Sequence, residues 1–146
     1  MELMASDKLD RELLARRRLR RAREPRVIAS WTNAGYRATA LSHAMHEQFL
    51  GQFRSSGTTR KSLEGSLLNA IVGLVQSSDL LVVIGWNVDE EPALLLQSDA
   101  LDQSEAFLRA IYPDGFVAAS HPFTRALIVD FDEYDVETDE VVFSQS

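Results

Sequence analysis

Short apolar runs in the second half of the chain, joined by brief polar links, limit the possible folds most strongly. They cover residues 80–86, 93–97, 116–119 and 125–131, with a shorter run at 141–143. Runs of this length, bounded by turn signals such as 87–92, predict strands, and the first two read as a hairpin. Because the links are short, we expect an antiparallel sheet with helices on one face.

Helical patterns precede this sheet. Periodicity predicts helices over 7–24, 36–53 and 62–76, separated by Pro25, a turn at 33–35 and a polar, basic loop at 54–61. The expected buried stripe of the second helix is Leu41, Met45, Phe49 and Phe53, and Ser62 caps the third. Asp102 and Glu105 fit a capping box for a short helix to residue 112.

The predicted fold class is therefore α+β, with N-terminal helices packed on a small, mainly antiparallel sheet in the order ααα-ββαββ(β). A length of 146 residues predicts a single domain over 1–146. The arginines of the basic helix in 1–25 leave it no wide apolar stripe, so we expect this helix to project from the body or to lie on an acidic surface.

The chain has no cysteine, which excludes disulfides, thiolate zinc sites and cysteine nucleophiles. No apolar leader follows Met1, and no apolar run is long enough to span a bilayer. These observations predict a cytoplasmic protein with no membrane association.

Charge is divided sharply along the chain. Residues 1–61 hold 13 Lys or Arg and 6 Asp or Glu, whereas residues 62–146 hold 2 and 16. Only Arg109 and Arg125 are basic in the second part. Such asymmetry concerns partners and association rather than the fold.

Few residues offer chemistry. His43, His46 and Glu47 lie within one helical turn and could ligate a metal, although their order is not that of zinc hydrolases. Asp130 and Asp132 share one strand face and could hold magnesium or exchange protons. Because no nucleophile elbow or dinucleotide-binding motif is present, we expect no enzyme, no cofactor and no resident metal.

The leading interpretation is an acidic protein-binding module of the immunity or antitoxin type from a bacterium, which presents carboxylates to a basic partner such as a nuclease toxin. The expected partner-binding residues are Asp130, Asp132, Glu133, Tyr134, Asp135, Glu137, Asp139, Asp89, Glu90, Glu91 and Trp86. Trp86 and Tyr134 would be aromatic anchors, although a core position is the ordinary alternative for Trp86.

Two alternatives belong to other classes. A nucleic-acid-associated regulator would use Arg16, Arg17, Arg18, Arg20 and Arg21, although an acidic protein disfavours nucleic acid. A small metal-dependent enzyme would use the two histidines and Glu47. The arginine helix could also pack on its own chain or on the second copy of a homodimer.

Overall fold

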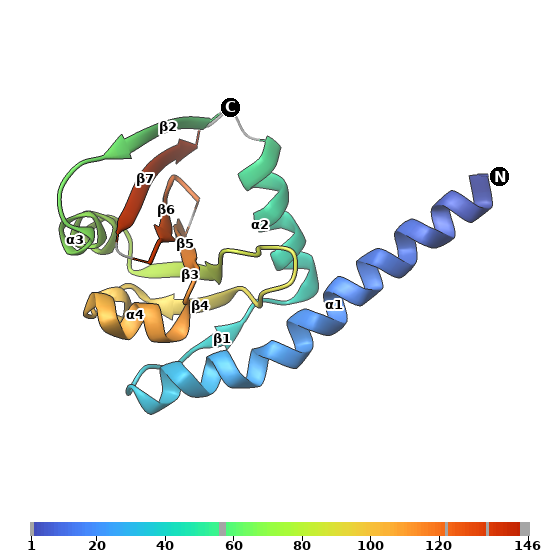
Figure 1. Ribbon diagram of the computed structural model, residues 1–146, viewed down its shortest axis with the longest axis horizontal. Helices are drawn as coiled ribbons and strands as arrows, with labels where there is room; N and C mark the ends of the chain where they lie inside the picture. Colours follow the sequence, from blue (N-terminus) through green and yellow to red (C-terminus); the bar gives the residue numbers. More distant parts are fainter. Residues whose placement is uncertain (1, 56–57, 122, 134, 144–146) are drawn as a thin grey trace.

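The computed structural model describes residues 2–55, 58–121, 123–133 and 135–143, and it confirms an α+β fold built on an antiparallel sheet (Figure 1). The strands are β1 (Thr39–Ala40), β2 (Thr58–Leu63), β3 (Leu80–Gly85), β4 (Leu94–Gln97), β5 (Gly115–His121), β6 (Arg125–Phe131) and β7 (Val136–Phe143). The helices are α1 (Glu2–Asn33), α2 (His43–Ser55), α3 (Leu67–Ser77) and α4 (Glu105–Ile111), with a 3-10 turn η1 (Ser98–Leu101).

The sheet order is β1-β4-β3-β5-β6-β7-β2, and every neighbouring pair is antiparallel. The predicted β3–β4 hairpin and the predicted strand at 125–131 are confirmed. β5 and β7 are longer than expected, because β5 runs through His121 and β7 begins at Val136. Pro122, between the predicted strands at 116–119 and 125–131, lies outside the described residues.

Helices cover both faces of the sheet, not the single face predicted. Successive strand residues point to opposite faces, so Val83 and Ile84 belong to different cores. α3 and the end of α1 pack on one face through Ile71, Leu74 and Trp31. On the other face, α2 contributes Phe49 and Leu50, and Figure 1 shows it on the opposite side from α3 and α4.

The first helix was predicted to stop at Pro25, but it continues to Asn33. An interior proline costs a helix about 3 kcal/mol. Beyond it, Val27 and Trp31 are buried in the core, and burial of such side chains contributes about 1.5–3 kcal/mol each. Tertiary packing therefore offsets the local cost of the proline. The helix ends at the predicted turn, where Gly35 has a φ of 96°.

The second helix begins at His43 rather than at residue 36, because β1 occupies part of the intervening segment. The Ser42 hydroxyl accepts a hydrogen bond from the Met45 N–H at 3.2 Å and caps the helix. The buried face also differs from the prediction. Met45 is 40% exposed, whereas His46 is 4% exposed and shares its face with Phe49 and Leu50.

The basic loop expected at 54–61 contains most of an edge strand. β2 pairs with β7 through Arg60 and Val141, and its last residue, Leu63, pairs with Thr138. Ser66, not Ser62, caps α3 by accepting a hydrogen bond from the Asn69 N–H. An edge strand with polar residues has little alternation of its own, so only its pairing partner reveals it.

The capping box predicted before α4 is also wrong. Ser104 caps the helix by accepting a hydrogen bond from the Phe107 N–H at 3.2 Å, while Asp102 ends η1. Within the described part of the chain, no helix has both the length and the apolar character needed to cross a membrane.

Candidate functional site

Most of the predicted carboxylates gather at one end of the sheet, where β6 turns into β7. We call Asp130, Asp132, Glu133, Asp135 and Glu137 the acidic sheet end. Asp130 and Glu137 are directly paired across the two strands, and all five side chains are exposed. None of the five carboxylates forms an ion pair with another described residue. Tyr134, the predicted anchor in this turn, lies outside the described residues.

Arg109 of α4 fixes the backbone of this turn without neutralising its carboxylates. Its guanidinium donates to the main-chain carbonyls of Asp132 at 2.9 Å and Asp135 at 3.1 Å. The guanidinium also forms an ion pair with Glu105 at 3.2 Å and a cation–π contact with the Phe131 ring, whose centroid is 4.6 Å away. The turn is therefore held in place while its side-chain charges stay outward. This role of Arg109 was not predicted from the sequence. Its position as one of only two Lys or Arg residues in 62–146 could have pointed to it.

Trp86 adds an aromatic side chain at the same end of the sheet. It is 46% exposed, so the alternative of a core tryptophan is wrong. The backbone N–H of Trp86 donates to the Gly115 carbonyl at 3.1 Å, and Gly115 pairs with Asp130 in the sheet. Trp86 therefore lies two strand spacings, about 10 Å, from Asp130 along one row of the sheet.

Three of the four other predicted carboxylates contact arginines of their own chain, and the fourth contacts an asparagine. Asp89 in the β3–β4 loop pairs with Arg54 at 2.6 Å and with Arg16 at 3.9 Å, and its carbonyl accepts from Arg20. Two further pairs join Glu91 to Arg23 and Asp139 to Arg60, each at 2.5 Å. Glu90 accepts a hydrogen bond from the Asn87 amide. Asp89, Glu91 and Asp139 therefore belong to internal contacts rather than to an open acidic surface.

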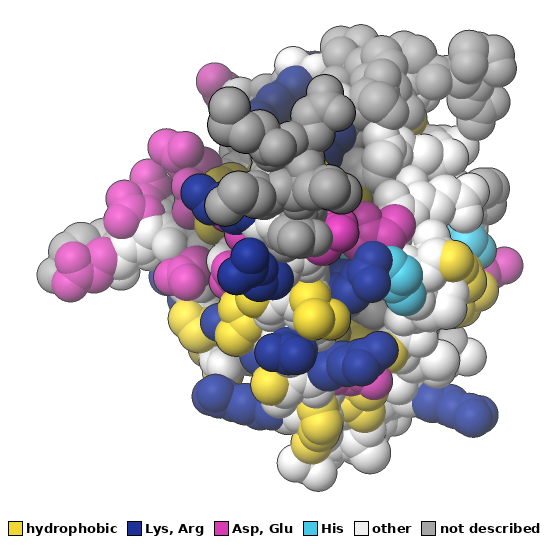
Figure 2. Space-filling model, turned by 90° about the vertical axis from the view of Figure 1, so that its right-hand side faces the viewer, with side chains coloured by type: hydrophobic (Ala, Val, Ile, Leu, Met, Phe, Trp, Pro, Cys, Tyr) yellow, Lys and Arg dark blue, Asp and Glu magenta, His cyan; other side chains and the backbone are white. Residues whose placement is uncertain are grey.

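Six of the arginines of α1 divide into two sets. Arg16, Arg20 and Arg23 contact the β3–β4 loop, whereas Arg17, Arg18 and Arg21 are exposed and form no ion pair with a described residue. Figure 2 shows Lys and Arg side chains gathered on the face along which α1 runs, with histidine beside them. Figure 1 shows the first turns of α1 extending beyond the sheet and the other helices.

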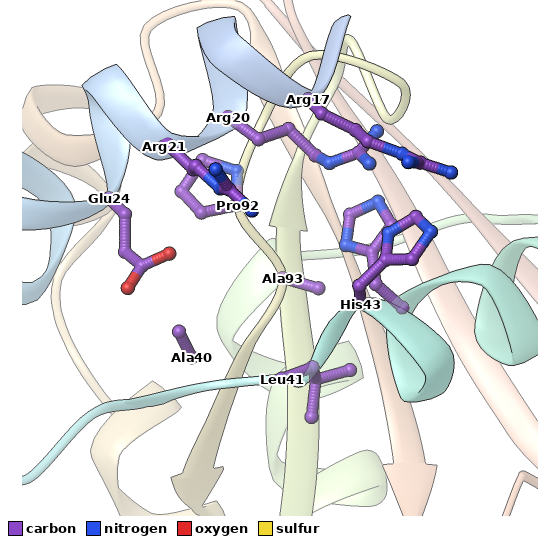
Figure 3. Close-up of a pocket in the computed structure, with 10 residues that line it drawn as sticks. Arg17, Arg20, Arg21, Glu24, Ala40, Leu41, His43, Pro92 and Ala93 are labelled. Carbon is purple, nitrogen blue, oxygen red and sulfur yellow. The ribbon is translucent and has the colours of Figure 1, made fainter. Parts of the chain in front are cut away.

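A pocket of about 230 Å³ lies between α1 and the start of α2. It is lined by Arg17, Arg20, Arg21, Glu24, Ala40, Leu41, His43, His46, Pro92 and Ala93. In Figure 3 the side chains of Arg17 and Arg20 reach from α1 towards the imidazole of His43. The pocket therefore combines cationic and imidazole side chains from two helices.

His46 is the buried polar residue of this pocket. Its Nε2 atom has no hydrogen-bond partner among the described residues. Burial, together with the positive charge of Arg20, lowers the pKa of His46 to about 4, although Glu47 and the backbone of Val88 act in the opposite direction. The imidazole is therefore neutral at pH 7.

The proposed metal ligands do not form a metal centre in the described part of the chain. No group of three or more His, Asp or Glu side chains has suitable geometry there. Arg20 lies 3.4 Å from the Glu47 carboxylate, which also lies 3.8 Å from His43 Nδ1. A guanidinium in this position already occupies the carboxylate and would repel a metal cation.

The chain thus presents two surfaces of opposite charge on separate elements: the acidic sheet end on β6 and β7, and the arginine–histidine pocket between α1 and α2. Searches against models of protein families, curated proteins and solved structures found no match for this chain.

Proposed function

We propose that this chain is an acidic protein-binding module, an inhibitor of the immunity or antitoxin type that neutralises a basic partner such as a nuclease toxin domain in the bacterial cytoplasm. The observation that carries the proposal is the acidic sheet end, in which five exposed carboxylates lie on a backbone held by Arg109. A site that normally receives phosphates is basic, and clustered carboxylates complement it.

The arrangement suits recognition for two reasons. Arg109 already holds the backbone of this turn at Asp132 and Asp135, so less conformational entropy is lost there when a partner docks. Trp86, exposed along the same row of the sheet, provides the kind of aromatic contact that dominates many interfaces. The proposed surface therefore has a charged part for steering and an apolar part for affinity. It leaves out Asp89, Glu91 and Asp139, whose charges have partners within the chain.

The test compares two variants that lose the same charge at different places. The first changes the acidic sheet end through Asp130→Asn, Asp132→Asn, Glu133→Gln, Asp135→Asn and Glu137→Gln. The control changes five other exposed carboxylates through Asp10→Asn, Glu12→Gln, Asp79→Asn, Asp99→Asn and Asp102→Asn. Each protein is used to capture partners from native lysate of the source organism at low salt, and bound proteins are identified by mass spectrometry.

We expect wild type and control to retain the same basic protein, and the acidic-end variant to lose it. Raising the salt concentration should weaken capture, because the attraction is electrostatic. The purified partner should then lose its activity when wild type is added. Equal capture by both variants would contradict the proposal, as would a captured partner that is acidic.

A second candidate, a nucleic-acid-associated regulator, keeps one supporting observation. Arg17, Arg18 and Arg21 remain exposed without an ion pair to a described residue, although Arg16 and Arg20 contact the chain's own loop. This candidate requires DNA or RNA binding that falls steeply with salt and disappears when the three exposed arginines are changed to glutamine. A gel shift at low salt that shows no binding would remove it.

A further inference from the structure

The pocket between α1 and α2 has more positive than negative charge. Arg17 and Arg21 lie one helical turn apart, and neither forms an ion pair with a described residue. Arg20 is already matched by Glu47 and by the Asp89 carbonyl. Since Glu24 is the acidic residue among those that line the pocket, the pocket keeps an excess of positive charge that an anion would balance.

The opposite wall is the N-terminus of α2. Peptide dipoles place partial positive charge at the first turn of a helix, which begins here at His43. His43 and His46 both line the pocket from this turn. Guanidinium groups from α1 and imidazoles from α2 therefore line the same pocket.

His46 is an independent sign that a ligand is missing. It is 96% buried, it lines the pocket, and its Nε2 has no partner among the described residues. Buried polar atoms in native proteins are nearly always hydrogen-bonded, so an unpartnered nitrogen beside a pocket calls for an atom that the chain does not supply. An anionic oxygen of a ligand would provide that atom, as the acceptor of a hydrogen bond from a protonated Nε2.

We propose that this pocket binds the phosphate group of a small phosphate monoester. A phosphate offers three acceptor oxygens, which match two guanidinium forks on one side and an imidazole on the other better than the two oxygens of a carboxylate. At about 230 Å³ the pocket is smaller than usual for drug-sized ligands, so the rest of the molecule is small or lies outside. His46 then takes up a proton and donates Nε2–H to the phosphate.

The same geometry argues against a nucleic-acid duplex as the ligand. A duplex backbone is contacted by arginines spread along an open surface, and it would engage the exposed Arg18 of the same helix. A buried imidazole between two helices reaches only a group that enters the pocket. Because the acidic sheet end lies on β6 and β7, this proposal is also independent of the proposed function.

The experiment titrates the full-length protein with inorganic phosphate and with phenyl phosphate, with sodium chloride at equal ionic strength as the reference. Binding is followed by calorimetry and by the NMR signals of the His46 ring. The test variant is Arg17→Gln/Arg21→Gln. The matched control is Arg18→Gln/Arg26→Gln, which removes two exposed arginines of α1 that do not line the pocket.

We expect saturable binding of both phosphates, with a rise in the His46 pKa. The test variant should weaken binding about tenfold or more, since two charge-assisted hydrogen bonds are lost, while the control should change it less than about twofold. The acidic-end variant of the preceding section should bind phosphate as wild type does, so each proposal can fail alone.

Three results would overturn the inference. The first is a His46 signal that does not move with either phosphate. The second is equal weakening in test and control variants, which indicates general attraction to a basic surface. The third is an oligonucleotide that binds more tightly than phenyl phosphate and binds equally well with and without a 5′-phosphate. That result would indicate nucleic-acid binding instead.

Discussion

The buried imidazole of His46 makes the stability of this protein depend on pH in a calculable way. Burial and Arg20 lower the pKa of His46 from 6.5 to about 4. Between these values the unfolded chain binds a proton that the folded chain does not. The contribution of His46 is therefore fully present above pH 6.5 and is lost as the pH falls towards 4.

The size of the loss follows from the two pKa values. Proton linkage gives a decrease in the free energy of unfolding of about 2 kcal/mol at pH 5 and about 3 kcal/mol at pH 4, relative to pH 7.5. That is a large part of the total for a domain whose stability is typically about 5–15 kcal/mol. His46→Gln removes the titrating group, so the variant should lack this part of the decrease.

Urea unfolding measured by circular dichroism at pH 7.5, 6, 5 and 4 provides the test, in buffers free of phosphate. His43→Gln is the matched control, because His43 begins the same helix and is exposed. Carboxylates titrate in all three proteins, so the difference between wild type and His46→Gln isolates the imidazole. The reasoning is refuted if wild type and His46→Gln lose the same free energy between pH 7.5 and pH 5.

Four further predictions concern the scaffold. Gly115→Ala should lower the free energy of unfolding by about 3 kcal/mol in urea titrations, since Gly115 has a φ of 119° and its Cβ would lie 2.1 Å from the Val129 carbonyl oxygen. Gly73→Ala in α3, whose Cβ meets nothing within 4 Å, should instead raise it by about 0.5–1 kcal/mol, and a loss there would contradict this account. Ser66→Ala should cost about 1 kcal/mol through the lost cap of α3, whereas Ser66→Asp should retain most of the stability in the same urea titrations. Arg109→Met should cost about 1–2 kcal/mol and speed amide exchange at Asp132, while Arg125→Met should leave that amide unchanged; an unaltered exchange rate in Arg109→Met would show that the turn needs no support from α4.

The acidic sheet end was recognisable in the sequence, but the state of its charges was not. A run of carboxylates after an apolar strand is visible in any linear reading of residues 125–140. Whether each carboxylate is open depends on partners distant in the chain. Arg60 reaches Asp139 across 79 positions, and Arg23 reaches Glu91 across 68. The predicted set therefore contained members that the folded chain uses internally.

The arginine–histidine pocket was likewise predicted only in part from the sequence. The sequence predicted the second helix and placed His43, His46 and Glu47 within one turn of it, as the structure does. It did not reveal that His46 is buried, although Phe49, Leu50 and Phe53 follow His46 at helical spacing and could have indicated it. The arginines opposite His46 come from another helix, and no local pattern predicts that meeting.

By itself the sequence determined the central strands, their hairpin, the class of fold and the separation of positive from negative charge. These features follow from side-chain periodicity, turn residues and composition, which act over a few neighbouring residues. Only the tertiary structure decided that α1 continues through Pro25, that residues of a basic segment become β2, and that both sheet faces are covered. In each case burial or pairing with a distant segment outweighs a local preference of at most a few kcal/mol, and that segment cannot be identified from the residues on either side.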